Sequence, residues 1–337
     1  REVIYTHRAL SCPAVAPPQP RVVSRVTTLS VTHAVAWYHA LPVLRAKRIV
    51  DVQPRPIETI GEGEGAGYAF YSFLGSSTTI SESSNHKAEV LAALQGLPLK
   101  LSKVHDVAVV LVDGRKLGLW DRSCDQRLEL PSSPPPRESL DILVEISARI
   151  NFGPAMAERK GLAGRVTAGI RPQDERELFW WESSAIPMHQ DQLSKLPWTS
   201  IEAVKDTTAP VFYRSTFELG PDEADQDTFI AVPGFHRGFV SCNGFNLGWH
   251  RREGPQMNLY APAALLKKGC NEVIVFEMIP DTSVSRHVQL ESAARWSQDH
   301  RRLLAHQVRE VVGFVHQVAK EWKYRLMLCC CRICDHF

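Results

Sequence analysis

The sequence predicts an all-β fold of two β-sandwiches followed by a C-terminal helical tail. Short runs of β-branched and aromatic residues, separated by Gly, Pro, Asp and Asn, recur from about residue 52 onward, which is typical of antiparallel sandwiches. One turn motif occurs twice, 130 residues apart. Only near the C-terminus does the apolar spacing change to the three- and four-residue steps of an amphipathic helix.

Composition and charge restrict the classes of function. The chain has 337 residues, 44% hydrophobic and 23% charged, which is enough for one large domain or two ordinary ones. Lys and Arg total 39 against 37 Asp and Glu, so the basic excess of a dedicated nucleic-acid-binding protein is absent. The flanks are basic and the middle is acidic. No apolar run approaches the roughly 18 to 20 residues of a bilayer span, so we expect no membrane span.

The first residues do not resemble a secretory leader, and the sequence begins with Arg1 rather than Met. We therefore expect a fragment or a processed chain, and the compartment stays open. No Asn lies in a glycosylation sequon that would favour secretion.

Five segments follow one another along the chain. The expected boundaries are 1–51 for a basic arm, 52–182 for the first sandwich, 183–204 for a linker, 205–285 for the second sandwich and 286–337 for the helical tail. The arm is rich in Val, Ala and Pro without sustained alternation, so we expect it to be poorly ordered, with at most one short helix over 34–50. The linker is polar and contains Pro, as domain boundaries often do.

The repeated turn motif indicates that both sandwiches follow one plan. The two copies are Asp113-Gly114-Arg115-Lys116-Leu117-Gly118 and Asn243-Gly244-Phe245-Asn246-Leu247-Gly248. Each follows an apolar strand, and an Asx-Gly pair there supplies the two positive-φ positions of a type I′ hairpin turn. About 27 residues after each turn, a further apolar strand begins that ends in Glu145 or Glu277. Two matching elements in the same order favour a duplication over two common turns.

The tail adds two weaker patterns. The apolar face of the predicted helix consists of Leu304, Val308, Val311, Val315, Val318 and Trp322. A basic amphipathic helix can bind a membrane surface or a partner, but packing on its own domain is more frequent. Cys331 and Cys334 form one C-x-x-C pair without a second, so we expect no zinc site. Without a dinucleotide-binding or phosphate-binding loop in the right context, we expect no cofactor.

Two clusters just after the hairpin turns are the best candidates for contact with sugar. They are Trp120-Asp121-Arg122 and Trp249-His250-Arg251. Aromatic rings can stack on a sugar ring while charged neighbours bond its hydroxyl groups, but aromatic residues at strand ends more often close a sandwich core.

The ordered motifs of residues 52–280 resemble the C-terminal half of β-galactosidases of glycoside hydrolase family 35. In the first module the matching text includes Gly67-Tyr68-Ala69-Phe70-Tyr71, Val104-His105-Asp106, Arg149-Ile150-Asn151-Phe152-Gly153-Pro154 and Lys160-Gly161-Leu162. In the second it includes Pro210-Val211-Phe212-Tyr213-Arg214, the turn at Asn243-Gly244, Gly254-Pro255-Gln256 and Leu259-Tyr260-Ala261-Pro262. Departures occur at Ile146-Ser147-Ala148, Ser241-Cys242 and Trp249-His250.

The resemblance implies jelly-roll or galactose-binding-like sandwiches that brace a catalytic (β/α)₈ barrel, in the same chain or as a partner. It also implies a secreted or lysosomal protein. Retaining hydrolysis of a terminal β-galactoside uses two Glu residues of the barrel, and neither of their sequence contexts occurs here, so no catalytic residue is carried over. We expect a non-catalytic portion that is inactive alone. The alternative is a free-standing carbohydrate-binding module that binds galactosides.

Overall fold

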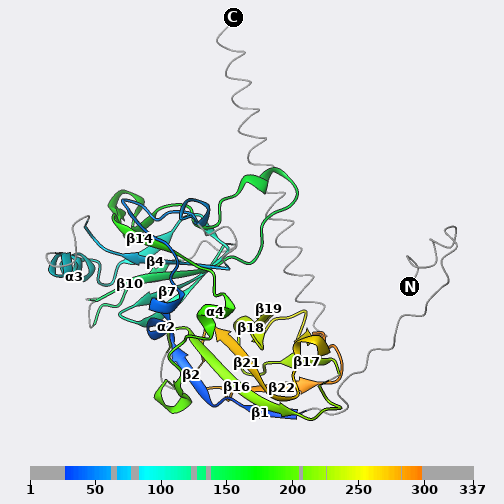
Figure 1. Ribbon diagram of the computed structural model, residues 1–337. Helices are drawn as coiled ribbons and strands as arrows, with labels where there is room; N and C mark the ends of the chain where they lie inside the picture. Colours follow the sequence, from blue (N-terminus) through cyan, green and yellow to red (C-terminus); the bar gives the residue numbers. More distant parts are fainter. Residues whose placement is uncertain are drawn as a thin grey trace, which may run out of the picture.

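Two β-sandwiches lie side by side in the structure, a computed structural model (Figure 1). It describes residues 27–61, 67–76, 83–122, 127–133, 138–204, 208–224, 226–281 and 283–297. The fold class is all-β, as the short strands predicted. The apolar helical face and the C-x-x-C pair of the expected tail, and the start of the expected arm, lie outside the described residues.

The first sandwich consists of a six-stranded sheet packed against two smaller sheets. In spatial order the large sheet contains β3 (Arg48–Asp51), β14 (Trp181–Ile186), β4 (Tyr68–Phe73), β10 (Leu140–Glu145), β7 (Val107–Val112) and β8 (Arg115–Asp121). Opposite it lie β13 (Arg176–Glu177), β12 (Val166–Ala168), β5 (Pro98–Leu101) and β9 (Leu128–Glu129), with the pair β11 (Gly161–Leu162) and β6 (Val104–His105). Helix α3 (Ser83–Ala93) belongs to the same unit.

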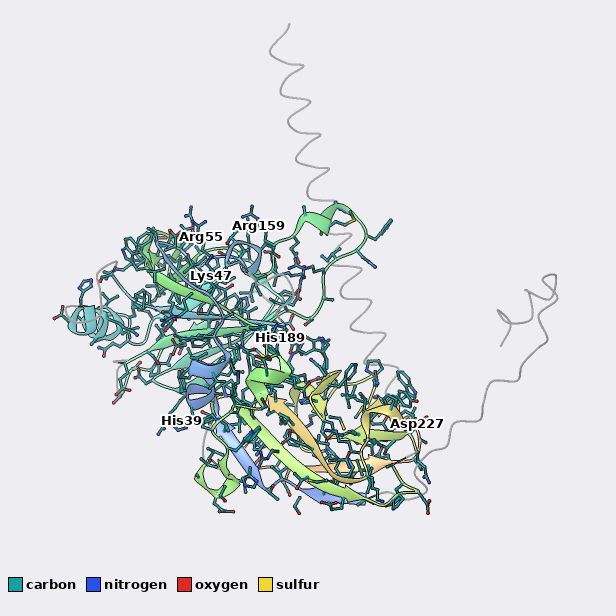
Figure 2. All side chains as sticks on the ribbon, in the orientation of Figure 1. His39, Lys47, Arg55, Arg159, His189 and Asp227 are labelled. Carbon is teal, nitrogen blue, oxygen red and sulfur yellow. The ribbon has the colours of Figure 1, made fainter. Side chains whose placement is uncertain are left out.

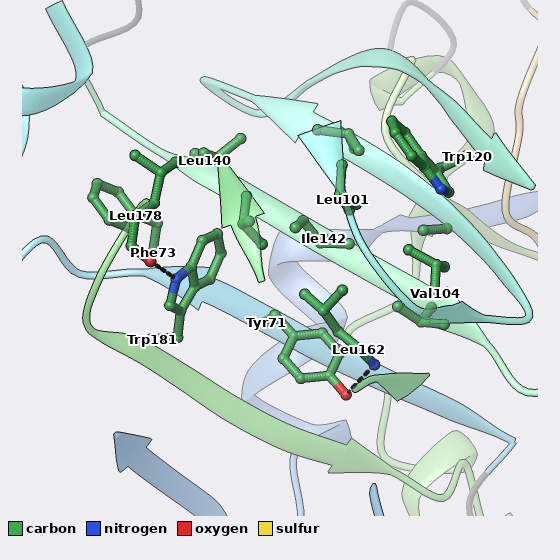
Figure 3. Close-up of a cluster of buried hydrophobic side chains, with 14 of the residues drawn as sticks. Tyr71, Phe73, Leu101, Val104, Trp120, Leu140, Ile142, Leu162, Leu178 and Trp181 are labelled. Atoms are coloured by element: carbon green, nitrogen blue, oxygen red, sulfur yellow. Dashed lines mark hydrogen bonds between the residues drawn. The ribbon is translucent and has the colours of Figure 1, made fainter. Parts of the chain in front are cut away.

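Figure 3 shows the core of this sandwich, where the polar ends of large rings are satisfied. The Trp181 indole nitrogen donates to the Leu178 carbonyl oxygen at 2.7 Å. The Tyr71 hydroxyl donates to the Arg55 carbonyl oxygen and accepts from the Leu162 amide. Such bonds remove the cost of burying a polar atom among apolar side chains.

The second sandwich pairs a six-stranded sheet with a four-stranded one. The first contains β15 (Thr199–Ser200), β2 (His33–Ala36), β16 (Val211–Leu219), β21 (Gly269–Glu277), β18 (Arg237–Cys242) and β19 (Phe245–Arg251). The second contains β1 (Thr27–Ser30), β22 (His287–Glu291), β17 (Thr228–Ala231) and β20 (Asn258–Ala261).

Short 3₁₀ helices occur along the described chain at η2 (Ile57–Thr59), η3 (Pro154–Ala157), η4 (Pro172–Asp174), η5 (Ile201–Ala203) and η6 (Ala263–Leu265).

Residues 27–51 are not part of a poorly ordered arm. They form β1 and β2 of the second sandwich, helix α2 (Trp37–Leu44) and β3 of the first sandwich. Strand β22, expected in the tail, pairs with β1 through Thr27 opposite Leu290. The first sandwich is therefore inserted between strands of the second. The arm was misjudged because four-residue strands are too short to show a clear alternation.

Both predicted hairpins are present, and they share their geometry. Asp113 and Asn243 both have a φ of +48°, and a positive-φ Gly follows each of them. A β-bulge interrupts the first hairpin between Val110 and Leu111, and the second at the equivalent place, between Val240 and Ser241. The shared bulge extends the likeness of the two copies beyond the turn itself.

A third apolar core joins the sandwiches. Helices α2 and α4 (Gln190–Leu193) lie at the junction, where Figure 2 labels His189 at the start of α4. Trp37 of α2 lies 5.5 Å from Phe70 of the first sandwich and 5.9 Å from Phe276 of the second, measured between ring centroids. Strands β7 and β10 are buried at all six positions because this core covers one face of their sheet and the first core covers the other.

Candidate functional site

A buried cluster of charged side chains lies beneath the loop of residues 147–160. Lys160 is 1% exposed, and its ammonium donates to the carboxylates of Asp106 at 2.9 Å and Glu158 at 3.1 Å. Arg122 also contacts both carboxylates, and the Ser147 amide donates to Asp106. Separating these groups would leave a buried charge unpaired, which is costly. The cluster therefore holds both ends of the loop, at Ser147 and Lys160, against the sheet.

The loop above this cluster presents apolar side chains to solvent. Phe152 is 87% exposed and Met156 is 60% exposed, on either side of Gly153, whose φ is +94°. Large apolar side chains that are exposed together on a firmly held loop are typical of a surface that another protein covers.

A second buried ion cluster joins the two sandwiches. The side chain of Glu145, at the end of β10, is 1% exposed and accepts two hydrogen bonds at 3.0 Å from Arg237 of β18. Arg251 of β19 donates to the same carboxylate at 3.2 Å, and the Ser147 hydroxyl at 2.8 Å. The cluster therefore links a strand of the first sandwich to two strands of the second.

Glu277 ends the equivalent strand of the second sandwich in a different environment. Its carboxylate accepts from the backbone amides of His236, Arg237 and Ile279. Burial raises the pKa of Glu277 to about 7, although these amides act in the opposite direction.

Asp106 and Glu158 lack the properties of a glycosidase acid pair. Asp106 and Glu158 share Lys160, but a catalytic pair needs one carboxyl group whose pKa is raised. Burial raises the pKa of both groups, and their hydrogen bonds to Lys160 and Arg122 outweigh that effect, so both pKa values lie below the ordinary range. Nor do the described residues contain three His, Cys, Asp or Glu side chains placed to hold a metal ion.

In the first cluster of sugar-contact candidates, the structure buries Trp120 and leaves Arg122 exposed. Trp120 is 4% exposed and packs in the first core, as Figure 3 shows, so its ring has no accessible face for a sugar. Asp121 ends strand β8, and Arg122 belongs to the cluster around Lys160. Trp120 therefore helps to close the sandwich core, which is the more frequent role of aromatic residues at strand ends.

The second group of candidates lies beside a cleft. Trp249 packs edge-on against Tyr68 of the first sandwich, at 5.4 Å between centroids. His250 is buried, its Nε2 lies 3.0 Å from the Phe276 carbonyl oxygen, and burial lowers its pKa to about 4. Arg251 contacts Glu145. All three nonetheless contribute to the wall of the cleft.

The cleft has a volume of about 420 Å³ and lies between the edge strands β19 and β20 of the second sandwich. Its other walls include Phe235, Arg252, Gln256, Arg295 and Trp296. Trp296 is 60% exposed. Sequence reasoning missed it because it follows the assumed end of the sandwich, and its position depends on a bridge to Gln256.

Comparison with known families assigns both sandwiches. Residues 80–186 match the family described as "Beta-galactosidase, first all-beta domain", and residues 210–271 match "Beta-galactosidase, galactose-binding domain". Both sandwiches are β-galactosidase domains. They are the non-catalytic all-β domains of these glycoside hydrolases, as the sequence motifs predicted.

Full-length relatives are longer than this chain. Beta-galactosidase 17 of Arabidopsis thaliana is 30% identical over 64% of this chain and 33% of that protein. The Beta-galactosidase of Xanthomonas manihotis is 37% identical over 48% of this chain and 25% of its own length. The chain thus spans about a quarter to a third of these β-galactosidases. Among solved structures, a Streptomyces avermitilis α-L-rhamnosidase aligns with 13% identity over 78% of this chain and 28% of that one, at a TM-score of 0.21, which is too low to support a shared fold.

In the described part of the chain, no helix is both long enough and apolar enough to cross a bilayer.

Proposed function

We propose that these two sandwiches brace a β-galactosidase catalytic barrel, which hydrolyses terminal β-galactosides, and take no part in the chemistry themselves. The observation that carries the proposal is the apolar loop around Phe152, which stands on the buried Lys160 cluster. A support must hold its contact surface in a fixed position, and the paired charges do this for both ends of the loop.

The junction between the sandwiches supports the same function. Trp37, Phe70, Phe212 and Phe276 form a continuous aromatic contact across it, and the Glu145 cluster adds hydrogen-bonded charges at its edge. An apolar junction with buried ion pairs resists relative motion, because opening it would expose both to water. The two domains therefore act as one rigid body.

A chimera tests the bracing function. In the Xanthomonas manihotis β-galactosidase, the segment that matches this chain is replaced by the corresponding segment of this chain. Hydrolysis of a chromogenic β-galactoside is then measured. We expect turnover by the chimera and none above buffer by the isolated 337-residue chain. Turnover by the isolated chain that galactose inhibits would contradict the proposal.

Two surface variants localise the contact. Phe152→Ser is expected to lower the melting temperature and the activity of the chimera, because it removes an apolar side chain from the contact with the barrel. Phe245→Ser is the matched control, because Phe245 is also exposed, at 56%, but lies on the hairpin of the second sandwich. Equal effects of the two variants would argue against a barrel contact at the 147–160 loop.

A free-standing carbohydrate-binding module is the second candidate, and the cleft beside β19 favours it. Its volume of about 420 Å³ lies within the range of small-molecule sites, and Trp296 offers an exposed ring at its edge. Titration of the chain with galactose, followed by Trp fluorescence, should show saturation. Flat traces up to tens of millimolar would reject this candidate.

A further inference from the structure

We propose that the cleft between β19 and β20 binds an acidic saccharide, a sugar that carries a carboxylate or sulfate group. The inference rests on the carbohydrate-binding function given above as the second candidate, and it adds the charge of the ligand. It is independent of the bracing function.

The cleft offers one exposed aromatic ring on a well-held segment. The backbone around Trp296 is fixed by hydrogen bonds from the Met257 amide to the Arg295 carbonyl oxygen and from the Ser297 amide to the Pro255 carbonyl oxygen. The Arg295 amide also donates to the Asn258 side chain. A ring held in this way can stack on a sugar without a large loss of side-chain entropy on binding.

Three arginine residues line the same cleft, and two of them form ion pairs. Arg251 contacts the Glu145 carboxylate at 3.2 Å, and Arg295 contacts the Glu291 carboxylate at 3.2 Å. The third residue, Arg252, has a partner of a different kind.

Arg252 is exposed, and among the residues that the structure describes its guanidinium contacts an imidazole and no carboxylate. Its Nη1 lies 2.6 Å from Nε2 of His236. Burial, and then the charge of Arg252, lower the pKa of His236, so this imidazole is neutral near pH 7 and accepts the hydrogen bond. Glu253, the next residue, is also exposed, but no contact joins it to Arg252 among the described hydrogen bonds and ion pairs.

The cleft therefore combines a ring that any sugar can stack on with a positive charge that only an acidic sugar can neutralise. A guanidinium group can donate two parallel hydrogen bonds to a carboxylate or sulfate, and such charge-assisted bonds are about twice as strong as neutral ones. A neutral galactoside would leave Arg252 hydrated at the rim. We therefore infer selectivity for the acidic sugar of about tenfold or more.

The test is calorimetric titration of the full 337-residue chain at low salt with four probes: methyl galactoside, galacturonic acid, galactose 6-sulfate and sodium sulfate. At least one acidic sugar should bind tenfold or more tightly than the methyl galactoside, and this advantage should shrink at 0.5 M salt. Comparison of galacturonic acid with the sulfate ester identifies which acidic group is preferred.

Variants assign the selectivity to the cleft. Arg252→Gln should reduce acidic-sugar affinity to near that of methyl galactoside, and Trp296→Ala should weaken all sugars. Arg165→Gln is the matched control, since this Arg is 68% exposed and faces Glu177 on the first sandwich. Unchanged melting temperatures show that the variants fold.

Each contrary outcome is distinct. Equal affinity for neutral and acidic sugars overturns the charge inference and leaves carbohydrate binding intact. Binding of sodium sulfate as tightly as of galactose 6-sulfate reduces the site to an ion site and overturns the inference. Binding of no probe overturns both the inference and the carbohydrate-binding function. Equal effects of Arg252→Gln and Arg165→Gln exclude the cleft as the source of selectivity.

Discussion

The two six-stranded sheets have the same strand order but different chain connections. Strands β4, β10, β7 and β8 of the first sheet correspond to β16, β21, β18 and β19 of the second. At the next position, however, the first sheet has β14, which follows its copy in sequence, and the second has β2, which precedes both copies. The two sheets therefore share the positions of their strands, whereas the part of the chain that fills this next position differs.

The copies also differ by one residue in register. Val112 pairs with Leu140 in the first sheet, and its equivalent Cys242 pairs with Val273 in the second. The counterpart of Glu145 is therefore Met278 and not Glu277. Because side chains alternate between the faces of a strand, this offset directs the two glutamates to opposite faces. Glu145 faces the other sandwich, where Arg237 and Arg251 neutralise it.

Removal of the Glu145 charge should produce the largest effect. Glu145→Gln leaves Arg237, whose side chain is 16% exposed, without its carboxylate, and breaking a buried ion pair in this way costs about 3 kcal/mol or more. Urea denaturation measures the loss. Glu272→Gln is the control on β21, since Glu272 is 36% exposed, lies 3.6 Å from Arg214 and should cost less than about 1 kcal/mol. Similar losses in both variants would mean that the Glu145 cluster does not join the sandwiches.

Local signals in the sequence predicted the all-β class and both hairpins, because an Asx-Gly turn is specified by two adjacent residues. The domain boundaries depend on pairings such as Thr27 with Leu290, which no local pattern contains. The sequence could not decide whether the Trp120 ring is buried or exposed, because the face on which a ring lies depends on the register of its strand, and the bulge near Val110 shifts that register. Lys160 gave no signal of burial, because Asp106, one of its two carboxylate partners, lies 54 residues away.

Glu277 and His250 should affect the pH dependence of folding stability in opposite directions. Its pKa of about 7 in the folded state exceeds the ordinary 4.5, so its contribution to stability falls as pH rises from about 4.5 to 7. His250 acts in the opposite direction, because its folded pKa of about 4 lies below 6.5 and its contribution rises with pH between these values. Each pKa unit is worth about 1.4 kcal/mol, so each contribution reaches roughly 3 kcal/mol and the two largely cancel.

Glu277→Gln should make the contribution of His250 to the pH dependence of stability measurable. The variant should gain roughly 2 to 3 kcal/mol of stability between pH 4.5 and 6.5, where the unsubstituted chain changes much less. Chemical denaturation at a series of pH values measures both curves, and their slopes are informative even if the substitution shifts overall stability. Parallel curves would show that Glu277 does not titrate in this range, and that its three amide hydrogen bonds outweigh its burial.

A reciprocal exchange at the hairpin turns tests how far the copies remain equivalent, and it should give the smallest effect. Asn243 donates through Nδ2 to the Leu265 carbonyl oxygen and to Asn271, so Asn243→Asp places a carboxylate against two acceptors and should cost about 1 to 2 kcal/mol. Asp113 accepts from the amides of Glu138 and Ser139 through Oδ1. Asn retains this oxygen and both bonds, so Asp113→Asn should cost less than about 1 kcal/mol. Melting temperatures of the two variants decide the matter: equal shifts would mean that the turns are interchangeable, whereas the predicted asymmetry means that the second turn has become specific to the loop that precedes β21.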